Sequence, residues 1–152
     1  MFDISKLGIG EWFPYQESKV DPLTGEVTWG EPSATEKICF RRMDPDRNRE
    51  ISEKYKGKKI NTPVMNPSSK KMELITTYEQ TPEQEKAERM AFWDEIISDW
   101  NITDPQGKSI PPTAENKYLL VKGSMEFLRF ANRCLEILSG AMVENKEASE
   151  KN

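Results

Sequence analysis

Residues 81–100 have the sequence TPEQEKAERMAFWDEIISDW and carry the clearest structural signal in the chain. Thr81 is placed to cap a helix, Pro82 suits the first helical position, and Gln84 is spaced to bond back to the cap. Apolar side chains then recur at helical spacing, at Met90, Trp93, Ile97 and Trp100. Together these features predict an amphipathic helix that runs as far as Trp100 and buries one face.

Two more helices are predicted after this one. Beyond a loop over residues 101–112, Thr113 is placed to cap a short helix that stops at Gly123, and Ser124 caps a last helix. The apolar residues of the last helix cover more than one face, so it is either buried on two sides or contacts a partner. Its candidate partner-binding residues are Phe127, Phe130, Leu135 and Leu138. One small domain can cover only part of this surface, and the exposed apolar part would associate with other chains, which predicts a homo-oligomer.

The part of the chain that precedes residue 79 is predicted to be rich in strands. A turn over residues 21–25 joins two short strands, at 18–20 and 26–29, in a hairpin. Residues 36–42 contain three successive apolar residues and predict a short buried strand. Asp44 and Pro45 begin a helix that ends at Gly57.

Two more strands are expected between this helix and residue 81. They cover residues 59–65 and 70–78 and flank the turn at 66–69. Met72, Leu74 and Thr76 would share one face of the second strand.

This order of elements predicts an α+β fold for the 152 residues. A small antiparallel sheet with one helix forms the strand-rich N-terminal part, residues 1–78, and about three helices form the C-terminal part, residues 79–143. Residues 144–152 are charged and small, and we expect a disordered tail there. The length suits one compact unit made of both parts.

Composition argues against an enzyme. The chain contains no histidine, which excludes Ser-His-Asp and Cys-His nucleophile pairs, HExxH zinc sites and histidine proton shuttles. Its eight glycines are dispersed and form no phosphate-binding loop. Glu95 and Asp99 lie four residues apart, but two carboxylates supply few ligands for a hard cation, and we interpret them as a solvated polar face. We therefore predict no catalytic residue, no metal site and no cofactor.

Charge is unevenly distributed along the chain, although the net charge is only -4. Residues 41–71 hold ten Lys and Arg against four Asp and Glu, and residues 79–104 hold two against eight. The candidate basic surface consists of Arg41, Arg42, Arg47, Arg49, Lys58 and Lys59. It could bind phosphates, but aromatic residues are sparse there, so nucleic acid is the weaker interpretation. The preferred one is that it faces the acidic segment within the assembly.

An aromatic cluster lies near the N-terminus, at Trp12, Phe13 and Tyr15. The proline that follows Phe13 suits an edge strand or an extended arm. The cluster either covers the core as large apolar side chains or docks on another chain, so these three residues are also candidate partner-binding residues.

Three local patterns resemble a group of small phage and prophage proteins encoded among tail genes, often described as tail assembly chaperones. The first is Gly10–Tyr15, and the second is Lys37–Arg42 followed by Asp44-Pro45. The third runs from Asp99-Trp100-Asn101-Ile102 through Asp104–Gly107 to Ile110–Lys117. The resemblance covers most of residues 10–140, and its motifs are structural rather than catalytic.

The resemblance implies a protein–protein interaction factor in phage tail morphogenesis, with a tape-measure or tail-tube subunit as its transient partner and no cofactor. A nucleic-acid-binding phage protein that uses the basic surface over residues 41–71, or a minor virion component, is the alternative. We expect a cytoplasmic location in the bacterial host, because the N-terminus lacks a signal peptide and no apolar run could span a membrane. Cys39 and Cys134 are then expected to be reduced and buried.

Overall fold

The order of the elements agrees with the predicted order except for one strand, Ile97–Trp100, which lies between two of the predicted helices. The computed structural model describes residues 10–151, and their side chains as far as residue 140. Seven strands are assigned in this part: β1 (Glu11–Pro14), β2 (Ser18–Val20), β3 (Val27–Trp29), β4 (Lys37–Phe40), β5 (Lys58–Met65), β6 (Met72–Glu79) and β7 (Ile97–Trp100). The helices are α1 (Pro45–Tyr55), α2 (Pro82–Ile96), α3 (Ala114–Gly123) and α4 (Met125–Lys151). Antiparallel sheets combined with these helices confirm the α+β class.

Strand β4 is the centre of the fold. It pairs antiparallel with β1 on one side and with β7 on the other, so the sheet order is β1-β4-β7. Its three apolar residues, Ile38, Cys39 and Phe40, are all buried, as the run of apolar residues predicted. Since β7 comes from the second half of the sequence, the strand-rich and helical parts form one interleaved body.

The predicted helix over residues 81–100 is wrong at its C-terminal end. Helix α2 stops at Ile96, and Ile97–Trp100 is strand β7. Two successive β-branched residues, Ile96 and Ile97, weaken the helical preference at this point. Strand β7 also completes the hydrogen bonding of β4, with Ile97 opposite Phe40. Tertiary pairing therefore overrides the helical spacing of the sequence.

Helix α4 covers the sheet and closes the core. Phe130 contacts Phe40 with ring centroids 5.9 Å apart, and Phe127 contacts Trp100 at 6.4 Å. Trp100 is 5% exposed, and its indole Nε1–H donates to the carbonyl of Ile110 at 2.6 Å. Trp100 thus lies in the core although the helix predicted around it ends earlier.

The predicted helix starts have the expected capping bonds. The Thr81 hydroxyl accepts from Gln84 N–H, and the Gln84 side chain accepts from Thr81 N–H, which completes the capping box. Asp44, Thr113 and Ser124 accept in the same way from backbone N–H groups at the starts of α1, α3 and α4. Local sequence therefore determines where each helix begins.

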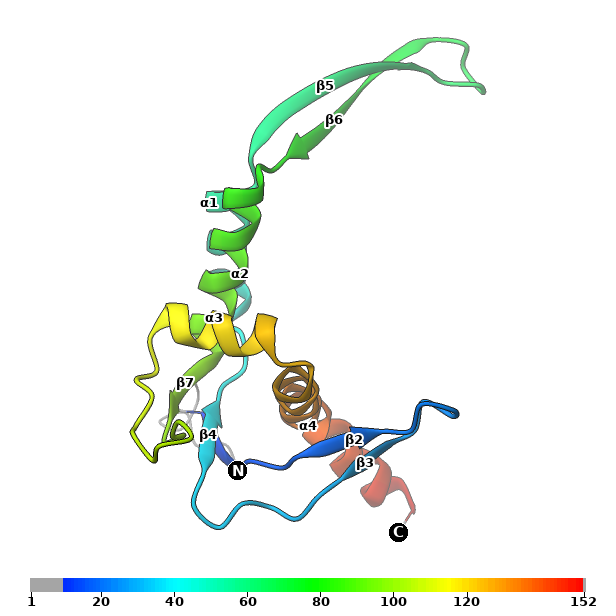
Figure 1. The fold of residues 1–152 in the computed structure, drawn as a ribbon. Helices are drawn as coiled ribbons and strands as arrows, with labels where there is room; N and C mark the ends of the chain where they lie inside the picture. The colour runs from blue at the N-terminus through cyan, green and yellow to red at the C-terminus, as the bar shows by residue number, and fades with distance from the viewer. Residues whose placement is uncertain (1–9, 152) are drawn as a thin grey trace.

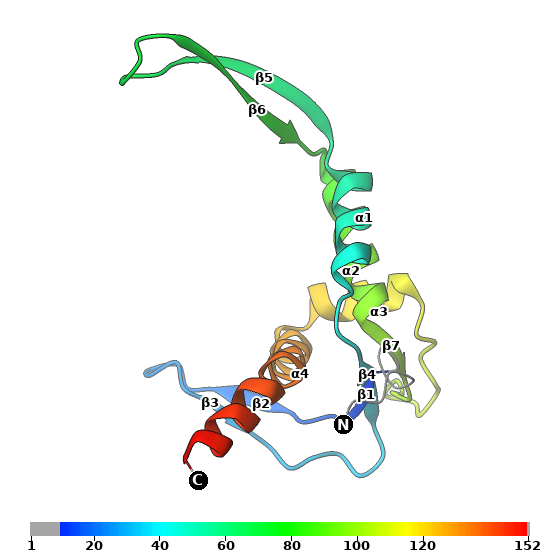
Figure 2. The same cartoon turned by 180° about the vertical axis from the view of Figure 1, so that it is seen from behind.

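A long hairpin extends away from the body (Figures 1 and 2). Helices α1 and α2 lie side by side, and at their far end β5 and β6 continue as a two-stranded antiparallel arm. Gly57 has a positive φ of 84° where α1 turns into β5, and a Cβ there would lie 2.2 Å from the carbonyl oxygen of Glu79. Only glycine fits this close approach, so Gly57 determines how the arm leaves the helices.

Three remaining predictions concern the tail, the cysteines and the membrane. Helix α4 extends to Lys151, and its side chains are described as far as Gly140. The disorder expected over residues 144–152 stays a prediction. Cys39 and Cys134 are both buried. Among the described residues, no helix has the length and apolarity needed to cross a membrane.

Candidate interaction surfaces

The arm formed by β5 and β6 is the most exposed apolar feature of the described structure. All of its residues except Ile60 are exposed. Its large apolar side chains in solvent are Val64, Met65, Met72, Leu74, Ile75 and Tyr78. Leu74, for example, is 71% exposed. Contiguous apolar surface of this kind marks sites of protein–protein contact.

The strand register separates these side chains into two faces. On the first face, the cross-strand pair Met65 and Met72 lies at the tip, and the pair Pro63 and Leu74 lies next to it. We call these four residues the tip patch. The shared face of Met72 and Leu74 that the sequence predicted is therefore confirmed.

The opposite face of the arm is mixed in character. It carries the pairs Val64 with Glu73 and Thr62 with Ile75. The Asn66 amide donates to the Glu73 carboxylate at 2.9 Å, which holds this charge away from the tip patch. Near the tip of the arm, the face that carries the tip patch is thus more apolar than the opposite face.

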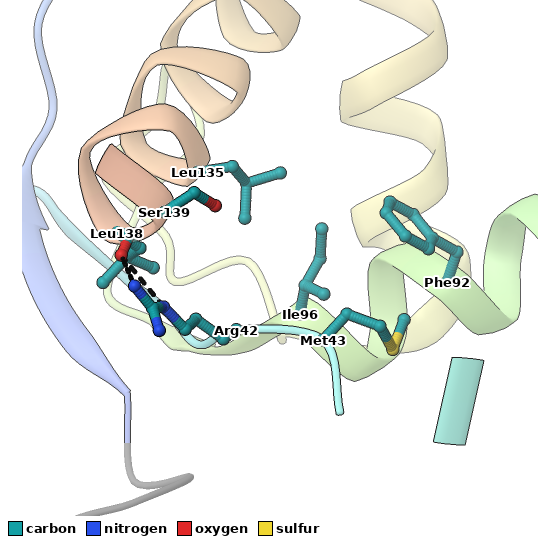
Figure 3. Close-up of a pocket in the computed structure, with 7 residues that line it drawn as sticks. All are labelled: Arg42, Met43, Phe92, Ile96, Leu135, Leu138 and Ser139. Atoms are coloured by element: carbon teal, nitrogen blue, oxygen red, sulfur yellow. Dashed lines mark hydrogen bonds between the residues drawn. The ribbon is translucent and has the colours of Figure 1, made fainter. Parts of the chain in front are cut away.

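A second apolar feature is a groove on the body, beside helix α4 (Figure 3). Leu135 and Leu138 from α4 line it together with Phe92 and Ile96 from α2, and its volume is about 480 Å³. Met43 and the Arg42 side chain complete the wall, and Arg42 Nε–H donates to the Leu138 carbonyl at 2.9 Å. Two predicted partner-binding residues, Leu135 and Leu138, therefore share one accessible groove.

Phe127 and Phe130 were also predicted to bind a partner, and the structure corrects this. They are 4% and 1% exposed, because α4 packs on the sheet with these rings between the two. A wide apolar stripe on a helix has two explanations, and for these two residues burial within the chain is the right one.

The aromatic cluster of Trp12, Phe13 and Tyr15 was predicted either to cover the core or to dock on another chain, and its members differ in this respect. Phe13 packs edge-on against Phe40 at 6.0 Å, and Tyr15 packs against Phe130 at 5.0 Å, so both cover the core. Burial and the Glu126 carboxylate, which accepts the phenol hydrogen bond at 3.2 Å, raise the pKa of Tyr15 to about 12. Trp12 is 48% exposed on the edge strand β1 and is the one member available to a partner.

The arginines of the predicted basic surface are engaged within the fold. Arg41 and Arg47 both form ion pairs with Glu95 of α2, at 3.2 and 3.3 Å. Arg49 lies 3.8 Å from Asp46, and Arg42 is bound to Leu138 as described above. Two of the four arginines, Arg41 and Arg47, therefore meet the acidic helix of their own chain, which is consistent with the preferred interpretation of complementary charge within the assembly.

Lys58 and Lys59, the other two members of the basic surface, lie apart from these arginines on β5 of the arm. The six residues do not form one continuous phosphate-binding surface. Glu95 and Asp99, the carboxylates four residues apart, lie on α2 and β7 respectively.

Sequence reasoning placed both strands of the arm but missed the arm as a surface. The signal was present in the alternation of Met72, Leu74 and Thr76, which was interpreted as one shared face of the strand, with no partner assigned to it. Nothing in the described structure packs on that face. Among the described residues there is also no cluster of three or more Cys, Asp or Glu side chains that could hold a metal ion. Comparison with protein-family models, with curated proteins and with solved structures finds no match for this chain.

Proposed function

We propose that this chain is a non-enzymatic protein-binding factor that acts in phage tail morphogenesis as a tail assembly chaperone, in the cytoplasm of the bacterial host. The observation that carries the proposal is the projecting arm with its exposed tip patch of Pro63, Met65, Met72 and Leu74. The resemblance in the sequence supplies the class of partner, a tape-measure or tail-tube subunit.

The chemistry of the tip patch suits a chaperone. A chaperone for hydrophobic tail subunits would need an accessible apolar patch that covers its client transiently. Met65 and Met72 are unbranched and polarizable, so they adapt to partners of different shape. Lys70 and Lys71 adjoin the patch and keep the free arm hydrated.

The groove of Leu135 and Leu138 is a second contact for the same partner. It lies at the C-terminal end of α2, whereas the arm leaves from the other end of that helix, and its lining is mostly apolar (Figures 1 and 3). A client that spans both features would contact the chain at two points, and the two contacts would reinforce each other.

Co-expression with a tail-tube subunit and with a tape-measure fragment tests this function. The chain should co-purify with one of them and increase its soluble yield. Leu74→Ser should reduce co-purification at least about tenfold, because it places a hydroxyl in the tip patch. Leu23→Ser is the matched control, since Leu23 is 94% exposed at the β2–β3 turn and should not matter.

Two results would contradict the proposal. One is that neither subunit co-purifies with the wild-type chain or gains solubility from it. The other is that Leu74→Ser and Leu23→Ser behave alike, which would remove the arm from the contact.

A further inference from the structure

The arm lacks the support that a two-stranded hairpin normally needs. Isolated hairpins are marginally stable in water, and a third strand or a packed helix is usually required. In the described structure both long edges of the arm face solvent, since β5 and β6 form a sheet of two strands and extend beyond the helices (Figures 1 and 2). An edge of this length is a template for another strand.

The two edges differ in what they offer. Asn66 N–H donates to the Lys71 carbonyl at 2.9 Å, so this pair closes the loop as a hydrogen-bonded pair. Opposite residues of an antiparallel pair alternate between hydrogen-bonded and non-hydrogen-bonded pairs. Residues 72, 74, 76 and 78 are in the non-hydrogen-bonded pairs with β5, so their N–H and C=O groups point outward from β6. On β5, Pro63 occupies an outward position and has no N–H to offer. The β5 edge is therefore blunted, and the β6 edge is complete.

The exposed edge of β6 is complementary to itself. Two antiparallel copies of β6 can bond only in registers that place even-numbered residues opposite one another, because these residues carry the outward groups. One such register has its two-fold axis at Ile75. It pairs Ile75 with Ile75, Leu74 with Thr76, Glu73 with Thr77, Met72 with Tyr78 and Lys71 with Glu79.

Charge selects this register among the allowed ones. It brings Lys71 opposite Glu79 of the second copy, and the two-fold axis makes the pair occur twice. Within the described part of the chain, neither Lys71 nor Glu79 has an ion-pair partner within 4 Å. The register also places Met72 beside the Tyr78 ring of the second copy, a favourable sulfur–aromatic contact.

We propose that two copies of this chain pair through the outer edges of their β6 strands, antiparallel about Ile75, and form a four-stranded sheet from their two arms. The bodies then lie at opposite ends of the joined sheet, because the strands run in opposite directions. The tip patches of both copies lie on the same face of this sheet, which doubles the apolar surface. The dimer does not depend on the proposed function, since it needs no client.

Sedimentation velocity of the purified full chain over a range of concentrations measures this dimer directly. Thr76→Pro removes an outward N–H from β6 and leaves the β5–β6 ladder intact, so it should raise the dimer dissociation constant at least about tenfold. Asn61→Pro is the matched control. Asn61 lies directly opposite Thr76, and both variants lose the Thr76–Asn61 side-chain hydrogen bond of 2.9 Å, but Asn61→Pro alters the β5 edge. It should leave the dissociation constant within about threefold of wild type.

Charge reversal then tests the register. Lys71→Glu and Glu79→Lys should each weaken the dimer, and the double variant should restore it, because the swapped pair keeps opposite charges in contact. Far-UV circular dichroism of each variant shows that the chain is still folded.

A monomeric wild-type chain would overturn the proposal and leave the client contact untouched. Equal effects of Thr76→Pro and Asn61→Pro would also overturn it, as would a dimer that Leu138→Glu in the groove abolishes and Thr76→Pro does not. A failure of the double charge reversal to rescue would refute the register about Ile75.

Discussion

Replacing Trp100 by alanine tests whether strand β7 is part of the core. The Trp100 side chain is almost fully buried, lies edge-on to Phe127 and donates its indole hydrogen bond to Ile110. Deleting a buried aromatic ring costs about 3–5 kcal/mol, from lost transfer free energy and the cavity left behind. Trp100→Ala should therefore lower the free energy of unfolding by about 3–5 kcal/mol.

A second substitution at the same position separates the ring from its hydrogen bond. Trp100→Phe keeps most of the buried aromatic surface but loses the bond to the Ile110 carbonyl and part of the ring volume, so it should cost less than Trp100→Ala, about 1–2 kcal/mol. Trp12→Ala is the control of the same type, and it should cost less than about 1 kcal/mol because Trp12 is half exposed on the edge strand.

Urea unfolding followed by far-UV circular dichroism is the suitable assay, because tryptophan fluorescence would change with the substitutions themselves. A loss below about 1 kcal/mol for Trp100→Ala would show that the ring lies at the surface and would refute the placement of β7. Equal losses for Trp100→Ala and Trp100→Phe would refute the division between ring burial and hydrogen bond.

Two further predictions concern the packing of helix α4. Phe130→Glu should unfold the chain, at a cost above about 4 kcal/mol, because it buries an unpaired carboxylate. Thermal unfolding followed by circular dichroism checks this, and a variant with wild-type stability would contradict it. The raised pKa of Tyr15, about 12 against the usual 10.0, predicts stability that is full below pH 10 and falls as the pH rises toward 12, since the unfolded phenol ionises first. Ultraviolet titration of wild type against Tyr15→Phe measures that pKa, and Glu126→Gln should lower it.

Features governed by neighbouring residues were predictable from the sequence. The capping box at Thr81 and the cap at Thr113 depend on side chains within three residues of the helix start, and both form as predicted. The hairpin of β2 and β3 depends in the same way on the Asp21 carboxylate, which accepts from Leu23 N–H at 2.8 Å.

Features that depend on distant pairing were not predictable in this way. Residues 97–100 have helical spacing, yet they form a strand because they pair with the edge of β4. Ile97 lies opposite Phe40, far from it in the sequence. Nothing near Ile97 in the sequence signals that edge. The arm shows the opposite case. Its strands were predicted, but its exposure depends on how the other described elements are placed around it, which no local sequence pattern records.

The candidate sites follow the same division. Leu135 and Leu138 were selected from a stripe that also holds Phe127 and Phe130, and only the packing of α4 separates the accessible pair from the buried pair. Apolar periodicity identifies a helix that must be covered, but it does not say whether its own chain or a partner covers it.

The central position of β4 has a consequence for how the chain emerges from the ribosome. Strand β4 is made early, but its neighbour β7 and the covering ring of Phe130 are translated much later. The body therefore cannot close until most of helix α4 has been synthesised, because its closing contacts join residues far apart in the chain. The hairpin strands pair with each other and α1 packs against α2, so these contacts join residues that are closer in the chain and can form sooner. A nascent chain would thus present its adhesive arm to neighbours on the same polysome before the rest of the protein has folded.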